Sequence, residues 1–324
     1  MTVDVRIDVH LTGEDLSAQL RADVRAGLSK RPRWLPPKWF YDARGSELFE
    51  RITRLPEYYP TRTERAILAA GAAGVAETSG AKTLVELGSG SSEKTRLLLD
   101  ALRAQGTLAR FVPLDVSEAA LREATAQIGT DYPGLEVHGL VADFTRHLDR
   151  IPTGDGRLVA FLGGTVGNLE PGERARFFGD LRATLHDGER LLLGADLVKD
   201  ASTLVAAYDD TEGVTAEFNR NVLRVLNHRL GADFEPGAFE HVARWDPRNA
   251  WIEMLLRSTK AQTATVPELG LSVDFEEGEE LRTEISAKFT VEGLGEELDA
   301  AGFAHEHTWT DPAGAFALLL ARAE

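Results

Sequence analysis

The sequence predicts an α/β protein in which a mostly parallel sheet is covered by helices on both faces. Between residues 63 and 197, short apolar segments typical of buried strands alternate with longer segments of helical periodicity. Repeated strand–helix units of this kind build parallel sheets. The last two expected strands, 305–310 and 315–321, are joined only by Asp-Pro-Ala-Gly. This connection is too short for a crossover helix, so we expect the final strand pair to be antiparallel.

The strands that precede this pair are recognised by continuous apolar runs, which suit strands buried on both faces. They are 83–87, 111–115, 135–141, 158–162 and 191–196. Segments with helical spacing follow them, including 92–104 and 173–185. Ser91 and Ser92 are good N-cap residues and are expected to start the first of these helices.

The pattern changes after the fifth strand. Residues 198–230 are helical in pattern, and 241–257 indicate a hairpin that turns at Asp-Pro-Arg-Asn, since Pro and Asn suit turns. A second hairpin is expected to turn near 276–279, with 281–289 as its returning strand. We expect the acidic run 274–280 to be a solvated turn.

The change of pattern predicts two domains, each made of separate chain segments. One is expected to contain residues 63–197 and 288–324 and to carry the parallel sheet. The other is expected to be an α+β domain made of residues 15–62 and 198–287.

Composition narrows the class of protein. The chain has 324 residues, and 43% of them are apolar, which argues against disorder. No segment approaches the ~20 consecutive apolar residues of a membrane span, and the N-terminus lacks a signal-peptide pattern. The net charge of −16 opposes binding to nucleic-acid phosphates. We therefore expect a cytoplasmic, monomeric protein that acts on a small molecule.

Metal binding is not expected. The sequence has no cysteine, and its eight histidines show no ligand spacing such as H-E-x-x-H.

Polar residues gather where the expected strands end. Gly88 and Gly90 follow the first strand and allow a tight turn that brings the backbone close to a ligand. Asp115, Asp143 and Asn168 follow later strands. Ligands of open α/β sheets lie beyond these carboxyl ends. A carboxylate at 115 suits ribose hydroxyls, and one at 143 suits an adenine amino group.

Two cofactor classes fit such an edge. A dinucleotide site of the G-x-G-x-x-G type would need glycine at Glu93, where a negative charge is unfavourable beside a pyrophosphate. Glu86, two residues before the first glycine, instead resembles the acidic start of the glycine motif in class I S-adenosylmethionine (SAM) methyltransferases. The expected sheet, with its antiparallel closing pair, resembles the Rossmann-like fold of that class.

Four segments narrow the resemblance: LPPKWFYD (35–42), LPEYYPTRTE (55–64), VELGSGSSEKT (85–95) and FLGGTVGN (161–168). Together they resemble the L-histidine Nα-methyltransferases of ergothioneine biosynthesis. The resemblance covers the chain from about residue 20 to its end. It implies SAM as cofactor and trimethylation of the histidine α-amino group to hercynine.

The resemblance also implies roles for single residues. The SAM site would use Gly88, Lys94, Asp115, Asp143 and Phe144. Asn168 and Tyr208 match positions that hold the α-amino and carboxylate end of the substrate. The imidazole would be bound by Tyr58, Glu284 and Ser286, with Met254 lining the pocket, and Tyr41 would help to orient the amine.

Glu284 and Ser286 lie two apart on an expected strand, so they face the same way, with Leu281, Thr283 and Ile285 on the other face. A carboxylate beside a hydroxyl can orient the two nitrogens of an imidazole. Without the resemblance, an exposed strand face would be the simpler explanation.

The alternative function within enzymes is N-methylation of another amino acid or small amine. A nucleic-acid adenine methyltransferase is disfavoured, because Gly163-Gly164-Thr165 stands where that class has its N/D-P-P-aromatic motif. The alternative outside enzymes is a regulator that binds SAM without catalysis.

Overall fold

The computed structural model describes residues 5–324. They divide into two compact units. The first contains residues 5–12, 62–197 and 289–324, and the second contains residues 13–61 and 198–288. Among the described residues, no helix is long and apolar enough to cross a membrane.

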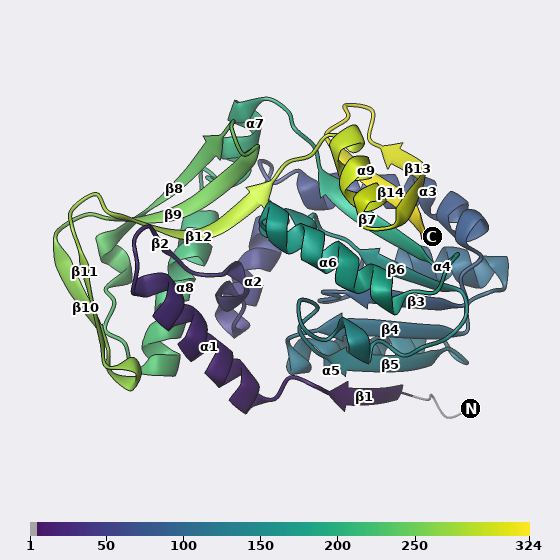
Figure 1. Cartoon of the computed structure of the whole chain (residues 1–324), viewed down its shortest axis with the longest axis horizontal. Helices are drawn as coiled ribbons and strands as arrows, with labels where there is room; N and C mark the ends of the chain where they lie inside the picture. The colour runs from purple at the N-terminus through teal and green to yellow at the C-terminus, as the bar shows by residue number, and fades with distance from the viewer. Residues whose placement is uncertain (1–4) are drawn as a thin grey trace. The chain divides into compact units, whose positions relative to one another are not determined.

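The first unit is built on one eight-stranded sheet, in the order β1-β5-β4-β3-β6-β7-β14-β13 (Figure 1). Neighbours from β1 to β7 pair in parallel, whereas β14 is antiparallel to both β7 and β13. The predicted fold class and antiparallel closing pair are confirmed. The strands are β1 (Val5–Val9), β3 (Thr83–Leu87), β4 (Arg110–Asp115), β5 (Glu136–Val141), β6 (Arg157–Phe161), β7 (Arg190–Asp196), β13 (Phe303–Thr310) and β14 (Phe316–Ala323).

Strand β1 was not expected from the sequence. It pairs in parallel with β5 at the edge of the sheet. Its sequence, Val-Arg-Ile-Asp-Val, lacks the continuous apolar run that marks the central strands, and Val5 and Val9 are exposed. Asp8 accepts a hydrogen bond from the imidazole of His138 on β5 at 2.9 Å.

Helices flank this sheet and bury its faces. Leu84 of β3, Phe111 of β4 and Leu318 of β14 share a buried cluster with side chains of the helices that precede and follow β3. Such close-packed contacts fix the strand ends in place. The helices of this unit are α3 (Pro60–Ser79), α4 (Arg96–Gln105), α5 (Glu118–Asp131), α6 (Pro171–Thr184) and α9 (Val291–Ala300), with 3₁₀ turns η2 (Leu148–Arg150) and η3 (Thr165–Asn168).

The second unit has a four-stranded sheet, in the order β2-β12-β9-β8, and a separate β10–β11 hairpin. Its strands are β2 (Arg33–Trp34), β8 (Phe239–Asp246), β9 (Trp251–Ser258), β10 (Gln262–Val266), β11 (Leu271–Phe275) and β12 (Glu280–Ala287). Its helices are α1 (Gly13–Leu28), α2 (Ala43–Ile52), α7 (Ala201–Ala206) and α8 (Val214–Leu230), with 3₁₀ turns η1 (Pro37–Phe40), η4 (Pro236–Ala238) and η5 (Pro267–Leu269).

The helical segment expected over 198–230 is broken into α7 and α8. Gly213 has φ = +73°, a conformation in which glycine is favoured. The carboxylate of Asp210 accepts hydrogen bonds from the backbone N–H groups of Val214 at 2.9 Å and Thr215 at 2.7 Å. This capping starts α8 anew and leaves Tyr208 in the connection between the two helices.

The prediction of a second hairpin with its turn near 276–279 was wrong, because the strands on the two sides of this turn do not pair with each other. Strand β11 pairs with β10 through the turn at η5, and β12 pairs with β9 instead of β11. The acidic segment between β11 and β12 is not simply solvated, because Glu279 accepts hydrogen bonds from Arg31 at 2.8 Å and Arg33 at 3.0 Å. The Arg31 guanidinium, with Arg33 beside it, lowers the pKa of Glu279 to about 2. This carboxylate therefore holds the entry to β12 near β2.

The alternation expected along β12 is interrupted by a bulge between Arg282 and Glu284. Glu284 lies opposite Met254 and Ser286 lies opposite Ile252, so both share one face of the sheet. Leu281 lies opposite Leu256, which is on that same face. The expectation that Leu281 faces away was therefore wrong, because a bulge shifts the side-chain alternation by one residue.

The bulged residue is anchored to α8. The hydroxyl of Thr283 contacts Oδ1 of Asn219 at 2.6 Å and the carbonyl of Met254 at 3.0 Å. Thr283 and Asn219 are fully buried. These contacts fix the strand immediately before Glu284.

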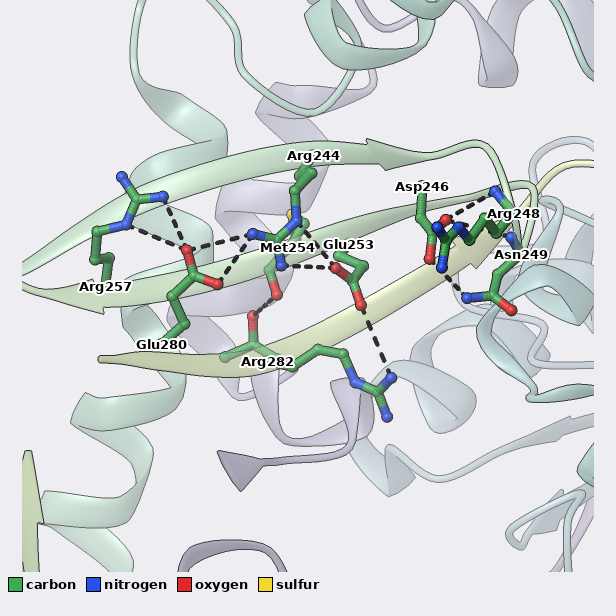
Figure 2. Close-up of polar contacts among 10 residues, drawn as sticks. Arg244, Asp246, Arg248, Asn249, Glu253, Met254, Arg257, Glu280 and Arg282 are labelled. Carbon is green, nitrogen blue, oxygen red and sulfur yellow. Dashed lines mark hydrogen bonds and ion pairs between the residues drawn. The ribbon is translucent and has the colours of Figure 1, made fainter. Parts of the chain in front are cut away.

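The opposite face of this sheet carries a network of charged side chains (Figure 2). Arg244 donates to Glu253 at 2.9 Å and to Glu280 at 3.1 Å, and Arg257 donates to Glu280 at 2.8 Å. Figure 2 shows these groups lying across β8, β9 and β12. The network occupies the face that Glu284 and Ser286 do not use.

Candidate functional site

The sheet of the first unit places polar residues at one edge. Strand β3 lies between β4 and β6, so the strand order reverses beside it. Ligands bind at such a switch point, outside the carboxyl ends of the strands. Gly88 follows β3, Asp115 ends β4, Asp143 comes shortly after β5, and Asn168 ends η3 after β6.

The turn after β3 leaves open space at two glycines. Gly88 and Gly90 have φ values of +68° and +50°, and a Cβ at either position would meet no atom within 4 Å. The turn is closed by Asp115, which accepts hydrogen bonds from the N–H groups of Gly90 at 2.9 Å and Ser117 at 2.8 Å. Each carboxylate oxygen thus has one backbone donor and can accept from one more.

Glu86, the fourth residue of β3, holds this turn through hydrogen bonds to its carboxyl group. It is buried, and burial raises its pKa to about 8, although hydrogen bonds from the hydroxyls of Thr95 and Ser92 act in the other direction. Ser92 contacts it at 3.1 Å and adopts φ = +54°. Ser91 and Ser92 therefore do not cap a helix as expected. Helix α4 begins at Arg96, and the hydroxyl of Ser92 binds the buried carboxyl group of Glu86 instead of capping the helix.

Glu64 is a residue that sequence reasoning missed. This fully buried carboxylate on α3 forms an ion pair with Lys94 and accepts a hydrogen bond from the N–H of Gly163 at 2.7 Å. It links the turns that follow β3 and β6. The only sequence signal is its place at the end of LPEYYPTRTE, because nothing in the spacing pairs it with Lys94.

Asp143 and Phe144 come shortly after β5. Asp143 is buried, and one of its oxygens accepts from the N–H and hydroxyl of Thr145 at 2.9 and 2.6 Å. The half-buried ring of Phe144 packs edge-on against Phe161, with centroids 5.0 Å apart, and against Phe177. These contacts fix the directions of the carboxylate and of the ring.

The second unit holds most of the residues expected to bind substrate. A chain of ring contacts links Tyr41, Phe49, Tyr58 and Tyr208, with successive centroids 5.6, 6.2 and 6.3 Å apart. Tyr41 is exposed, whereas Tyr58 and Tyr208 are buried. The structure therefore brings Tyr58 and Tyr208 together as edge-on neighbours.

Tyr208 also contacts the strand that carries Glu284. Its hydroxyl lies 2.7 Å from the hydroxyl of Ser286, and Lys288 donates to both oxygens. Glu284 is half-buried beside the buried Met254 of β9. Asn168 belongs to the first unit. Lys288 was not singled out by the sequence, although it continues the alternation of Glu284 and Ser286.

Comparison with known proteins identifies the family. A model described as "Histidine-specific methyltransferase, SAM-dependent" matches residues 20–323. The chain belongs to this family. The resemblance found in its sequence motifs is thereby confirmed, and the protein is a SAM-dependent methyltransferase.

Two relatives of this methyltransferase have nearly the same length. It is 56% identical to the histidine N-alpha-methyltransferase of Mycolicibacterium smegmatis, over 96% of this chain and 97% of that protein. It is 55% identical to the histidine N-alpha-methyltransferase of Mycobacterium tuberculosis, over 98% and 99%. Ergothioneine biosynthesis protein 1 of Neurospora crassa is 35% identical over 62% of this chain and 23% of that protein.

The edge of the methyltransferase sheet suits SAM chemically. A sulfonium nucleoside has no phosphate and carries a positive charge, so the carboxylates of the half-buried Asp115 and the buried Asp143 are compatible with it. The two open glycine positions leave room for a nucleoside against the backbone. No cluster of three or more His, Asp or Glu side chains suited to a metal ion occurs within residues 5–324.

Proposed function

We propose that this methyltransferase transfers three methyl groups from SAM to the α-amino nitrogen of L-histidine, giving hercynine for ergothioneine biosynthesis. The observation that carries the proposal is the shared face of β12, where Glu284 and Ser286 lie beside Met254. A carboxylate and a hydroxyl in this arrangement can hold both nitrogens of an imidazole. The similarity to the two mycobacterial enzymes supports the same substrate.

We assign SAM binding to the first unit. Asp115 would accept from the ribose hydroxyls with the lone pairs that its backbone donors leave. Asp143 would accept from the adenine amino group, with Phe144 covering the ring face. Gly88 would admit the nucleoside, and Lys94, held by Glu64, would place an ammonium group on the same edge. SAM supplies an electrophilic methyl group on sulfur.

We assign histidine binding mainly to the second unit. Tyr58, Glu284 and Ser286 would surround the imidazole, and Met254 would line its pocket. Tyr208 would hold the amino-acid end, as would Asn168 from the first unit. Tyr41 would help to orient the amine. A monomeric state and a cytoplasmic location remain our predictions from the sequence.

The chemical task of the chain is alignment. Displacement at a methyl group is in-line, and holding the reactants in position can supply ~7–11 kcal/mol of such a barrier. The α-amine must be neutral before it attacks. Because Glu284 and Ser286 are fixed by the strand register, they can set the imidazole so that the amine stays aimed through three successive transfers.

The test is to incubate the protein with SAM and each amino acid separately and to weigh the products by mass spectrometry. The proposal predicts that histidine gains the mass of three methyl groups. Methylation of a different amino acid or small amine, with histidine untouched, would favour the alternative function. SAM binding without any methylated product would favour the regulator.

A further inference from the structure

The carboxylate of Glu64 is buried inside the first unit, but its charged partner reaches the edge of the sheet. Glu64 lies on α3 and is fully buried, whereas the side chain of Lys94, with which it forms an ion pair, is 24% exposed. The other oxygen of Glu64 accepts a hydrogen bond from the N–H of Gly163 at 2.7 Å. One carboxylate therefore holds both the lysine that follows β3 and the turn that follows β6.

Strand β7 leaves room for this carboxylate at Gly194. A Cβ on Gly194 would overlap Oε1 of Glu64, whereas the next nearest atoms would lie 3.4 Å away. Glycine weakens the interior of a strand and often marks the close approach of another group. Gly194 lies inside β7, between Leu193 and Ala195. The sheet is therefore shaped to seat the Glu64 carboxylate.

The order of the strands places Lys94 at the amino-acid end of SAM. Adenine and ribose are assigned above to Asp143, after β5, and Asp115, at the end of β4. Strands β3 and β6 come next in the sheet (Figure 1), so the amino-acid part of SAM would extend towards them. The ammonium of Lys94 lies on this side, 3.7 Å from the position of a Cβ on Gly163. The carboxylate is the only negative group of SAM and would bind this ammonium.

We propose that Glu64, seated against Gly194, is a positioning residue that sets the ammonium of Lys94 for the carboxylate of SAM. A lysine side chain loses rotamer freedom when it is fixed. The ion pair with Glu64 imposes this loss on folding, so that it does not weaken ligand binding. A lysine ammonium has three donors, of which Glu64 takes one. The inference rests on the proposed SAM site but not on which amine is methylated.

The test measures the affinities of two nucleosides by calorimetry. S-adenosylhomocysteine has the amino-acid part of SAM, and methylthioadenosine lacks it. Glu64→Gln keeps the size of the side chain and an acceptor for the N–H of Gly163, but removes the charge that holds Lys94. We expect the affinity for S-adenosylhomocysteine to fall about tenfold, or about 1.4 kcal/mol. The affinity for methylthioadenosine should stay close to that of the wild type.

A double-mutant cycle tests whether Glu64 acts through Lys94. Lys94→Gln removes the ammonium but keeps a hydrogen-bond donor for Glu64. It should itself lower the affinity for S-adenosylhomocysteine, and Glu64→Gln should add almost nothing in its presence. Additive losses would overturn the proposal, because Glu64 would then act without Lys94. An affinity that Glu64→Gln raises or leaves unchanged would also overturn it, since Glu64 would then not help Lys94 to bind the ligand.

Gly194→Ala keeps the proposal testable if Glu64→Gln does not fold. Its Cβ would displace the Glu64 carboxylate from the side of the strand, so we expect the same selective loss of affinity for S-adenosylhomocysteine. An equal loss for both nucleosides would contradict the proposal, because the carboxylate would then only hold the sheet together.

Glu189→Gln is the matched control. Glu189 is another buried glutamate of the first unit, and it accepts a hydrogen bond from Arg157 at 2.9 Å where β6 and β7 begin. This variant should lose stability but keep the wild-type ratio of the two affinities. If Lys94→Gln leaves that ratio unchanged, the assignment of Lys94 to SAM falls together with this inference. If Lys94→Gln changes the ratio and Glu64→Gln does not, this inference alone falls.

Discussion

The backbone carbonyl oxygen of Tyr208 lies 2.8 Å from Nε2 of the buried His241. Nδ1 of the same imidazole lies 2.8 Å from the amide nitrogen of Asn219. An amide nitrogen only donates, so Nδ1 must accept and Nε2 must carry the proton. Asn219 in turn accepts from Thr283 beside Glu284. A neutral histidine thus links the connection that holds Tyr208 to the bulge of β12.

This link predicts a pH dependence of stability. Burial lowers the pKa of His241, against the effect of Asp209 and Asp210, while Arg220 acts in the same direction as burial. The unfolded state therefore binds a proton at His241 more readily than the folded state does. The neutral imidazole stabilises the folded state above the ordinary histidine pKa of ~6.5, and this stabilisation is lost as the pH falls through the lower pKa of the folded state. Melting temperatures of wild type and His241→Gln should converge as the pH is lowered from 7 to 5, given the ordinary pKa of roughly 6.5. Parallel pH profiles would contradict the link.

Glu86 predicts a trend in the opposite direction. Its pKa is raised by burial from 4.5 to about 8, so the folded state favours the protonated carboxyl group. The resulting stabilisation is present below the unfolded pKa and is lost as the pH rises through about 8, by on the order of a few kcal/mol. Glu86→Gln has a similar shape but does not titrate. The melting temperature of Glu86→Gln, relative to that of the wild type, should therefore rise between pH ~6 and ~9. A difference between the two melting temperatures that does not change with pH would show that Glu86 ionises normally.

Substitution of Gly90 by alanine tests whether the open space at this glycine holds the nucleoside. Alanine at this position is strained by the positive φ, at a cost of about 1 kcal/mol, and places a methyl group in the space proposed for the nucleoside. Gly106→Ala is a matched control, since Gly106 has φ = +77° and open space around it at the end of α4. Both variants should lose similar stability in denaturant, but only Gly90→Ala should lose SAM affinity by calorimetry. Equal SAM affinities would place the nucleoside elsewhere.

Glu284 tests the substrate assignment. Glu284→Gln removes the negative charge proposed to orient the imidazole, so KM for histidine should rise by about tenfold, whereas SAM binding should hardly change. Glu253→Gln is the control, because Glu253 lies on β9 within the charge network of the opposite face (Figure 2). A loss of SAM affinity as large as that for histidine would mean that Glu284 has another role.

The central strands were predictable because burial on both faces requires long apolar runs, and the short 311–314 connection fixed the sense of the last pair. Edge strand β1 was missed because Val5 and Val9 are exposed and give no such run. The prediction that the segments now seen as β11 and β12 form a hairpin was wrong. Glu279, between them, pairs with Arg31, which precedes β2, and with Arg33, which lies in β2. Such long-range ion pairs leave no local pattern.

The site divides in the same way. Gly88, Asp115 and Asp143 follow strands, so their gathering at one edge could be predicted from the sheet alone. Glu64, Lys288 and His241 act through contacts between residues far apart in the chain, which neither spacing nor periodicity reveals. The bulge at Thr283 likewise depends on a buried hydrogen bond to α8.

The proposed transfer of methyl groups to the α-amino nitrogen of histidine can be observed by NMR. SAM with a ¹³C-labelled methyl group is supplied together with L-histidine, and the spectrum of the purified product is recorded. We expect one labelled resonance from three equivalent methyl groups on the α-nitrogen, at the position of authentic hercynine. Labelled methyl groups on the imidazole ring, or an unlabelled histidine beside a labelled different amine, would contradict it.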